Sequence, residues 1–449
     1  MSTLGWHSLG TSFDCACGER HALPIKAVHQ SLDAAQQLAN FAKSNCGSIC
    51  LVVTDENTFS VAGDEVIRAL VDAGKSVDEH RYGSAIFEAT EELGEEVKAQ
   101  AIQYASDFIV AIGSGTLCDL AKYAGDKLGK PVLLYGTAAS MNGYTSAIVA
   151  LKVRGLKRTL PCAPALGVFC NPEHAATAPT RMTAAGVADF LSKCSSSTDW
   201  RAGHLLQGDY FCERPREFFQ GTQERVLEFS PKVPSGDPEA IYHVMEALLL
   251  SGCSMVIAGS SSPASGGEHL LSHYLDMKSA LYDLPNDFHG TQVGVGTVHC
   301  LGLWENILAL NPGDIDVDSL LAQRISKAEV DRWIQEDWGD KVGAEVQSQW
   351  DEKYRDDTAQ RAFLRKAIEM LPTLNQELPV DLLPAATVAK AIEASGGPVV
   401  AEGLMAPVEE YNNALKRARY IRNRFTVLDF AADLGIEEKY IARSTKNSY

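Results

Sequence analysis

Short apolar runs alternate with amphipathic segments in the first third of the chain, beginning near Ser48. Runs of four to eight apolar residues bounded by turn signals are typical of buried strands, whereas apolar residues repeating every three or four positions indicate helices. The alternation predicts βαβ units around a parallel sheet, the outline of a nucleotide-binding fold. The predicted strands are Ile49–Thr54, Ser76–Tyr82, Phe108–Ile112 and Val132–Tyr135, and the predicted helices are Ser60–Ala73, Thr90–Ala105 and Thr116–Leu128.

Helical periodicity dominates after about Thr177. Asp237-Pro238-Glu239 supplies a cap, an N1 proline and a first-turn acid ahead of a predicted helix at 240–257. A chain of 449 residues exceeds a typical single core. We therefore expect two domains, an α/β dinucleotide-binding domain at 1–177 and an α-helical metal- and substrate-binding domain at 178–449.

One predicted helix in the second domain covers the sequence TAAGVADFLSKCSSSTDW, residues 183–200. It places Asp189 and Lys193 four residues apart on one face, the spacing of a modest surface ion pair. Asp189 is nevertheless embedded in apolar neighbours, which is unusual for a surface carboxylate.

The composition of the chain limits the classes of partner that the protein can bind. The net charge of −18 argues against nucleic acid or an anionic membrane surface, although a local pocket could still bind a small anion. The N-terminal sequence lacks a basic region followed by an apolar core, and the longest apolar segment, Val244–Ala258, contains Glu246 and is too short to span a bilayer. Eleven scattered cysteines fit reduced thiols. We expect a cytoplasmic protein.

Cys15, Cys17 and His21 form a small cluster near the N-terminus. They could supply three zinc ligands, but C-x-C is not the usual spacing and no fourth ligand is nearby in the sequence. A tight turn with buried thiols is the favoured interpretation.

Two features suit a dinucleotide. Gly113-Ser114-Gly115-Thr116 follows a predicted strand and opens a helix, where glycines and free N–H groups can receive a pyrophosphate. The motif is short, Asp119 lies near the position expected for a third glycine, and a plain strand-to-helix turn explains it nearly as well. Asp55 follows the first strand and could bind a ribose or cap a helix, with equal support for each.

The loop YGTAASMNGYTS offers the hydroxyls of Thr137, Ser140 and Ser146 and an Asn142-Gly143 turn. Its position after a sheet strand favours a role in a site over an ordinary surface loop. The following segment, Ala147–Pro161, predicts a hairpin around Gly155 whose basic residues are solvated; these are Lys152, Arg154, Lys157 and Arg158.

Three histidines lie between Ser265 and Gly290. His269 and His273 are four apart on a predicted helix, and His289 follows on a loop, so all three could face one cavity. Ser265 and Glu268 match the S-x-x-E capping box, which would start this helix. Taken alone, an H-x-x-x-H pair is also compatible with half-buried or surface histidines.

Together these motifs resemble a family. GSGT with a following aspartate, TAASMNGYTS, GVADFLSK, SGGEHLLSH and a later HG occur in order, and the closing RYIRNRFTVLDFAADLG extends the likeness. The chain resembles the sn-glycerol-1-phosphate dehydrogenases, especially the bacterial AraM-like group, within the metal-dependent polyol dehydrogenase and dehydroquinate synthase-like superfamily. The resemblance implies an α/β nucleotide-binding domain, an all-α C-terminal domain and a metal in the cleft between them.

The resemblance also implies residue roles. Asp189, His269 and His289 would hold a divalent metal, zinc or nickel, with iron also compatible. Asp189 and His273 would be catalytic, and both would contact the substrate together with Asn142. The cofactor, NAD or alternatively NADP, would contact the following residues: Asp55, Gly115, Thr116, Leu117, Cys118, Asp119, Thr137, Ala138, Ala139, Ser140 and Ser146.

The implied reaction is reversible reduction of dihydroxyacetone phosphate, or a close analogue, to sn-glycerol 1-phosphate by a homodimer. One position departs from the family, which usually has Asp where this chain has Asn142. Asn loses the charge and gains an N–H donor, so a polyol dehydrogenase with a different substrate remains an alternative. Two further alternatives are a dehydroquinate synthase-like cyclase, whose metal carboxylate is typically Glu, and a weakly active homologue with a binding or regulatory role.

Overall fold

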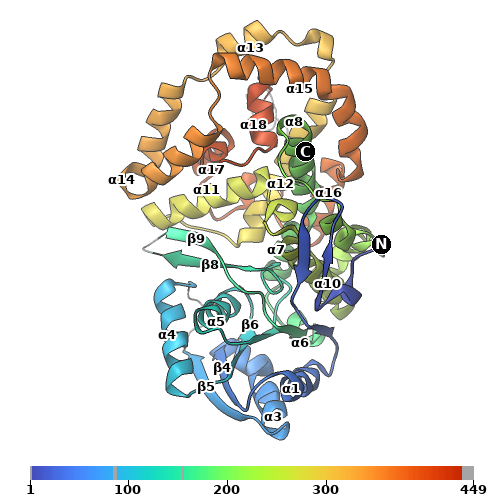
Figure 1. Ribbon diagram of the computed structural model, residues 1–449, viewed down its shortest axis with the longest axis vertical. Coiled ribbons are helices and arrows are strands. Elements are labelled where there is room, and N and C mark those ends of the chain that lie inside the picture. The colour runs from blue at the N-terminus through green and yellow to red at the C-terminus, as the bar shows by residue number, and fades with distance from the viewer. Residues whose placement is uncertain (1–2, 84–87, 154–155, 437–449) are drawn as a thin grey trace. The chain divides into compact units, whose positions relative to one another are not determined.

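The computed structural model describes residues 3–83, 88–153 and 156–436. The chain forms two compact units, shown in Figure 1. The first contains Met1–Phe190, Cys212–Ser261 and Ala391–Gly397, and the second contains Leu191–Phe211, Ser262–Lys390 and Pro398–Tyr449.

A six-stranded parallel sheet forms the centre of the first unit, with strand order β3-β10-β7-β6-β4-β5. Its strands are β3 (Ala27–Gln30), β4 (Ile49–Asp55), β5 (Ser76–Tyr82), β6 (Phe108–Gly113), β7 (Val132–Gly136) and β10 (Gly167–Cys170). The four predicted strands are confirmed to within one residue at each end. The interior strands β4, β6 and β7 are continuous apolar runs because helices cover both sheet faces, whereas the edge strand β5 is polar and partly exposed.

Alternate residues of the strands face opposite layers. Cys50, Val52 and Val110 join a core with α1 (Ala34–Asn45) and α3 (Asp64–Asp72). The intervening residues, such as Leu51 and Ile109, are equally buried and face the other side of the sheet, to which α4 (Glu91–Gln103) and α5 (Gly115–Leu128) belong. The three predicted helices of this region are therefore present; the first is shorter than expected because a short α2 (Glu56–Thr58) and a π-turn at Phe59–Gly63 precede α3.

The first unit also contains two small hairpins and several further helices. The hairpins are β1 (Thr11–Asp14) with β2 (Arg20–Leu23), and β8 (Ile148–Val153) with β9 (Leu156–Pro161). The second hairpin confirms the prediction for this segment, although Arg154 and Gly155 lie outside the described residues. The helices are α6 (Pro172–Ala176), α7 (Thr180–Leu191, whose last residue begins the second unit), η3 (Arg214–Phe219), α9 (Thr222–Phe229), η4 (Ser230–Ser235) and α10 (Pro238–Ala258).

Helix α10 begins as the sequence predicts. The Asp237 carboxylate accepts a hydrogen bond from Ala240 N at 2.9 Å, and Pro238 occupies the first turn. Among the described residues, α10 is the one helix long and apolar enough to cross a membrane, but 83% of its apolar window is buried inside the protein. Its apolar character is therefore explained by core packing.

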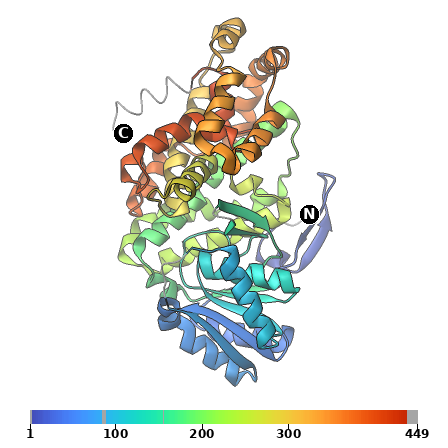
Figure 2. The same cartoon turned by 90° about the vertical axis from the view of Figure 1, so that its left-hand side faces the viewer.

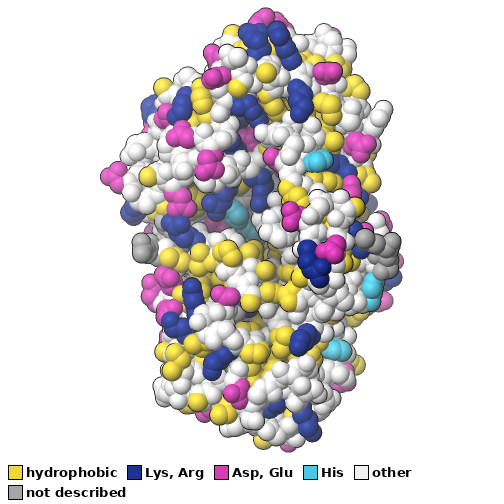
Figure 3. Space-filling model, in the orientation of Figure 1, with side chains coloured by type: hydrophobic (Ala, Val, Ile, Leu, Met, Phe, Trp, Pro, Cys, Tyr) yellow, Lys and Arg dark blue, Asp and Glu magenta, His cyan; other side chains and the backbone are white. Residues whose placement is uncertain are grey.

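The second unit is built from helices. They are α8 (Lys193–Gln207), α11 (Gly267–Tyr282), α12 (His289–Leu308), α13 (Val317–Gln323), α14 (Lys327–Lys353), α15 (Asp357–Glu377), α16 (Ala385–Ala394, which continues into the first unit), α17 (Val408–Arg417) and α18 (Val427–Asp433). The prediction of a largely helical C-terminal part is confirmed. On the molecular face shown in Figure 3, basic and acidic side chains are interspersed, so that face lacks the continuous basic surface that nucleic acid requires.

Glycines allow the loop after β7 to pack against two helices of the first unit. A Cβ at Gly186 of α7 would lie 2.0 Å from the Ala139 carbonyl oxygen. A Cβ at Gly252 of α10 would lie 2.0 Å from Thr145 Oγ1 and 2.6 Å from the Asn142 carbonyl oxygen. The Thr145 hydroxyl, in addition, donates to the Leu249 carbonyl at 2.6 Å. This loop is therefore held in one position by its close contacts.

We predict that Gly186→Ala destabilises the protein, because the added methyl group meets backbone that cannot move away easily. The expected loss is about 1–3 kcal/mol of unfolding free energy. Gly343→Ala in α14 is the matched control, since a Cβ there meets nothing closer than 3.9 Å. That control is expected to gain up to about 1 kcal/mol from helix propensity. Thermal and urea unfolding would measure both, and equal stability of the two variants would contradict the packing argument.

Candidate active site

Three histidines come together in the second unit. His269 and His273 lie on α11, and His289 is the first residue of α12. The ring centroids of His269 and His289 are 5.2 Å apart, those of His273 and His289 are 5.7 Å apart, and those of His269 and His273 are 6.2 Å apart. His269 is buried and His289 is half-buried. The structure therefore brings the three predicted histidines close together.

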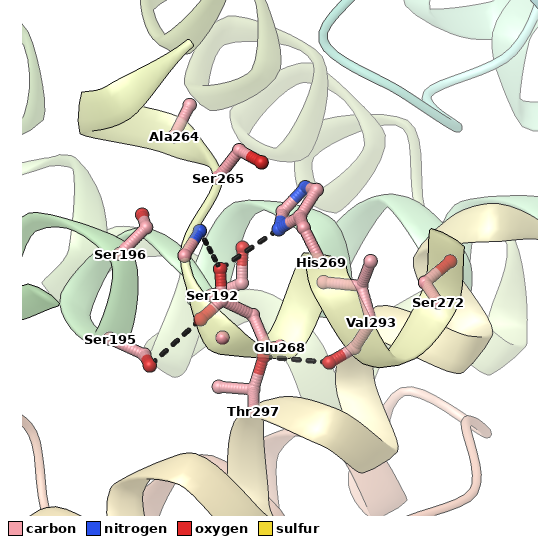
Figure 4. Close-up of polar contacts among 12 residues, drawn as sticks. Ser192, Ser195, Ser196, Ala264, Ser265, Glu268, His269, Ser272, Val293 and Thr297 are labelled. Carbon is pink, nitrogen blue, oxygen red and sulfur yellow. Dashed lines mark hydrogen bonds and ion pairs between the residues drawn. The ribbon is translucent and has the colours of Figure 1, made fainter. Parts of the chain in front are cut away.

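Glu268 fixes the orientation of the His269 ring, as Figure 4 shows. Its Oε1 accepts hydrogen bonds from His269 Nδ1 at 2.9 Å and from Gly266 N at 2.7 Å, and its Oε2 accepts one from Ser195 Oγ at 2.9 Å. Because a carboxylate only accepts, the proton of His269 is on Nδ1. Burial alone would raise the pKa of Glu268, but the hydrogen bond from His269 and those from two backbone N–H groups bring the pKa below its ordinary value.

The start of α11 differs from the predicted capping box. The N-cap is Gly266, and Ser265 does not cap the helix. Glu268 does reach back to the N-cap N–H, while Asp199 of α8 accepts from Gly267 N at 2.8 Å. A Cβ at Gly266 would lie 2.6 Å from Asp199 Oδ2, so only glycine permits this approach. The prediction that Ser265 caps the helix is wrong, because the buried Asp199 carboxylate from α8 accepts from the first turn of α11 instead.

A chain of hydrogen bonds fixes the His289 ring. The Asp276 carboxylate accepts from Asn286 Nδ2 at 2.8 Å, and Asn286 Oδ1 accepts from Gln292 Nε2. Gln292 Oε1 then accepts from the Ser272 hydroxyl at 2.8 Å, whose oxygen contacts His289 Nδ1 at 2.9 Å. Since the Ser272 proton is committed to Gln292, His289 Nδ1 is the donor in the last contact. Both histidines thus carry their proton on Nδ1.

Asp189 is 2% exposed and lies in the last turn of α7. The prediction of one continuous helix through Asp189 and Lys193 is wrong, because Ser192 interrupts it and α8 begins at Lys193. Lys193 is fully buried and donates to the Ala264 carbonyl at 3.1 Å. Asp189 and Lys193 therefore do not form a surface ion pair, because both side chains are buried.

In the first unit, the end of β6 and the start of α5 form a turn suited to an anion. Gly113 ends β6 beside Gly136 of β7, Ser114 is the N-cap, and α5 starts at Gly115. Because β4 and β6 are neighbours whose crossovers lead to opposite edges of the sheet, this turn lies at a topological switch point. Gly115 and Thr116 are half-buried. First-turn N–H groups of a helix lack acceptors within the helix and attract anions.

The other predicted cofactor residues divide by accessibility. Ser140 is half-buried. The side chains that are nearly or fully buried are Asp55, Leu117, Cys118, Asp119, Thr137, Ala138, Ala139 and Ser146. The backbone of Thr137 joins the loop to the turn, because its N–H donates to the Gly113 carbonyl at 3.1 Å.

Asp55 caps a helix. Its Oδ1 accepts from Thr58 N at 2.7 Å, and Thr58 Oγ1 accepts from Asp55 N at 3.1 Å, so the two residues form a reciprocal capping box. Of the two roles considered for Asp55, the structure shows the cap. Its second carboxylate oxygen is compatible with the other role.

Asp119 and Lys122 connect α5 to β8 and to the loop that precedes β8. Asp119 Oδ2 accepts from Ala150 N at 2.9 Å, and burial raises the pKa of this carboxyl to about 6 while Lys122 and the hydrogen bond from Ala150 N oppose the shift. Lys122 Nζ donates to the carbonyls of Gly143 at 2.8 Å and Ile148 at 2.7 Å and contacts Ser146 Oγ at 3.4 Å. Ser146 is thus part of the loop's framework.

Asn142 lies on the same loop and is half-buried. Its Nδ2 donates to Ser251 Oγ of α10 at 3.2 Å. The hydroxyl of Ser251 can accept from an amide, as here, or donate to a carboxylate.

Comparisons with known proteins show the family to which this chain belongs. Residues 30–179 match the model of the iron-containing alcohol dehydrogenase family. The glycerol-1-phosphate dehydrogenase of Pyrococcus horikoshii is 34% identical over 264 residues, which cover 59% of this chain and 74% of that protein. The chain belongs to the glycerol-1-phosphate dehydrogenase family. The Bacillus licheniformis member is 28% identical over 345 residues, covering 77% of this chain and 84% of that protein.

Solved structures confirm the fold class of this glycerol-1-phosphate dehydrogenase family member. An iron-containing alcohol dehydrogenase from Thermococcus thioreducens matches with a TM-score of 0.61 at 15% identity, covering 95% of this chain and all of that one. A probable glycerol dehydrogenase from Sinorhizobium meliloti matches with a TM-score of 0.51 at 21% identity, covering 83% of this chain and 96% of that one. The predicted α/β plus helical, dehydroquinate synthase-like architecture is confirmed.

Sequence reasoning missed most of the supporting residues in this family member. Glu268 was predicted only as a possible helix cap. The sequence contains no sign of the hydrogen-bond chain that leads from His289 through Ser272, Gln292 and Asn286 to Asp276. Lys122 was also missed. A charged residue directly before a candidate ligand histidine was the one available signal, since ligand histidines usually donate their second N–H to a carboxylate.

We predict that Glu268→Gln weakens metal binding roughly 10–100-fold while preserving the fold. The amide oxygen can still accept from Gly266 and His269, and Ser195 can accept from the new NH₂ group, but the negative charge that makes His269 a stronger ligand is lost. Chelator competition on the purified protein would measure the affinity. Glu239→Gln, at an exposed side chain in the first turn of α10, makes the same chemical change and is expected to have no effect. Unchanged affinity in Glu268→Gln would show that this carboxylate does not tune the site.

Proposed function

We propose that this protein is a metal-dependent oxidoreductase that reduces dihydroxyacetone phosphate, or a close analogue, to sn-glycerol 1-phosphate with NAD(P)H. The observation that supports this most strongly is the pair His269 and His289, whose Nδ1 atoms are both engaged by the protein so that both Nε2 atoms are suited to one ion. This pair occurs in a chain of the glycerol-1-phosphate dehydrogenase family.

In this proposal, Asp189 joins His269 and His289 as the third ligand. One carboxylate and two imidazoles are a donor set suited to zinc, nickel or iron, and three protein ligands leave room for a substrate oxygen. Asp189 is buried, as ligands of a protein-held metal commonly are. When bound, the ion supplies Lewis acidity toward a ketone oxygen.

The cofactor is proposed to bind at the carboxyl ends of β4 and β6. Gly115, Thr116 and Leu117 would present the first-turn N–H groups of α5 to the pyrophosphate, and Ser140 would offer its hydroxyl. The second carboxylate oxygen of Asp55 would accept from a ribose hydroxyl, which favours NAD over NADP. The remaining cofactor residues, Cys118, Asp119, Thr137, Ala138, Ala139 and Ser146, would shape this turn and loop. The nicotinamide supplies hydride when bound.

His273 is proposed to handle the proton. Its ring lies nearly parallel to that of His289, with an interplanar angle of 18°, one helical turn along α11 from His269. A neutral or protonated imidazole can exchange a proton with a hydroxyl near physiological pH. Asn142 would bind the polar end of the substrate through its amide. We further propose a homodimer in a reducing compartment such as the cytoplasm, consistent with cysteines that are all unbridged.

A substrate panel with both cofactors on metal-characterised protein tests the proposed function. We expect oxidation of NADH or NADPH that depends on dihydroxyacetone phosphate, and formation of sn-glycerol 1-phosphate in stoichiometric amount. His273→Asn should lower kcat by roughly 10²–10⁴-fold if it moves the proton. Turnover without net cofactor oxidation would identify a cyclase instead. Failure to act on any phosphorylated triose or polyol would refute the proposal.

The role of Asn142 has its own test. We expect Asn142→Asp to raise kcat/KM for dihydroxyacetone phosphate about tenfold, equivalent to about 1.4 kcal/mol of transition-state stabilisation, by restoring the family's carboxylate. The Ser251 hydroxyl can donate to the new carboxylate, so the loop should keep its position. Ser251→Ala is the control, since it removes the partner and leaves the amide. Equal activity of wild type and Asn142→Asp would remove the idea that Asn142 tunes the substrate.

A further inference from the structure

A second group of potential metal ligands lies within the first unit. Three of its members, Cys15, Cys17 and His21, come from the β1–β2 hairpin, and the fourth, Cys212, lies two residues before the start of η3. The ligand atoms all lie within 4.8 Å of one another. His21 and Cys212 are buried, and Cys15 and Cys17 are half-buried. The sequence offered no nearby fourth ligand, and the fold provides one.

The distances between these atoms match a tetrahedral ion. Cys15 Sγ and Cys212 Sγ are 3.7 Å apart, while His21 Nε2 lies 3.3 Å from Cys17 Sγ and 3.5 Å from Cys212 Sγ. Zinc with bonds of about 2.3 Å to sulfur and about 2.0 Å to nitrogen, arranged tetrahedrally, requires S–S distances of roughly 3.8 Å and S–N distances of roughly 3.5 Å. A disulfide would require about 2.05 Å between the sulfurs.

The hairpin turn places its two cysteines on one side. Gly18 N donates to the Cys15 carbonyl at 3.1 Å, and Cys15 N donates to the Glu19 carbonyl at 3.0 Å. Gly18 has a φ of +93°, which glycine adopts without strain, so the chain reverses directly after Cys17. His21 follows on β2, paired with Phe13 of β1.

Several contacts seat the hairpin and its flanks on helices of the first unit, where Figures 1 and 2 show it in dark blue. Leu4 N donates to Glu217 of η3, Trp6 Nε1 donates to Glu246 of α10 at 3.4 Å, and the Arg214 guanidinium lies 5.2 Å from the Phe13 ring centroid. The strands have four residues each, and such a short two-stranded ribbon has little stability of its own. Its position therefore depends on these contacts and on the four-residue cluster.

We propose that Cys15, Cys17, His21 and Cys212 bind a structural zinc ion, distinct from the metal proposed for the active site. Three thiolates and one imidazole fill all four tetrahedral positions with protein ligands, as in structural zinc sites, and soft sulfur ligands select zinc over magnesium or calcium. The ion joins residues 197 positions apart in the chain. Cys212 is the first residue of the segment 212–261, which belongs to the first unit. The ion therefore attaches the start of this segment to the N-terminal hairpin.

Metal content of the full-length protein, purified without chelator, tests this site. Wild type is expected to carry one zinc that remains in His269→Ala/His289→Ala and is lost in Cys17→Ser and Cys212→Ser. Cys46→Ser, at a half-buried cysteine outside this cluster, should retain it. Cys17→His should also retain it, since a second imidazole is an acceptable ligand. Because the two metal sites are removed by different variants, failure of one proposal is distinguishable from failure of the other.

Cobalt substitution provides a second measurement that does not need the cysteine variants to fold. In Co²⁺-loaded His269→Ala/His289→Ala protein, we expect the near-ultraviolet sulfur-to-cobalt charge-transfer band of a thiolate site, and we expect its loss on titration with a thiol-specific mercurial. Zinc that disappears entirely with His269→Ala/His289→Ala would overturn the proposal. A Cys15–Cys212 disulfide without metal, found by mass spectrometry of the freshly purified protein, would overturn it equally.

Discussion

The buried carboxylate of Glu268 imposes the strictest condition on the helical unit. A charge taken out of water is tolerated only when it is paired and hydrogen-bonded, and this one is fully buried. Three donors meet it, from Gly266, His269 and Ser195. Each donor requires a particular residue at its position: Gly266 before α11, His269 directly after the glutamate, and Ser195 on α8. The orientation of His269 is thus a consequence of satisfying a buried charge.

The surroundings of Glu268 extend this condition to other helices. Asp199 is buried nearby, and burial followed by the charge of Glu268 raises the pKa of Asp199. Asp199 accepts from Gly267, from Trp304 of α12 and from Val427 of α18, so one side chain links three helices. Arg424 donates to the Ser265 carbonyl and lies within electrostatic range of both carboxylates. Two acids and one guanidinium therefore organise the region that presents the histidines.

Much of the fold was predictable because it depends on local patterns. Four of the six strands of the sheet were predicted from short strand-like runs, and α10 from its Asp-Pro-Glu start, since these signals are encoded over a few residues. The errors arose where distant residues override local signals. Ser265 matched a capping box, but Asp199 and a glycine occupy that end of α11. Asp189 and Lys193 matched the spacing of a surface ion pair, but both side chains are buried.

By itself, the sequence determined the class of fold, the sites of the glycine-rich turn and the three histidines, and the resemblance that led to the family. These follow from periodicity, spacing and residue type. Only the tertiary structure decided which ring nitrogen of each histidine carries the proton, because Glu268 and the chain ending at Asp276 act through contacts between helices. It alone brought Cys212 to the N-terminal hairpin, since the return of residues 212–261 to the first unit has no local signature in the chain.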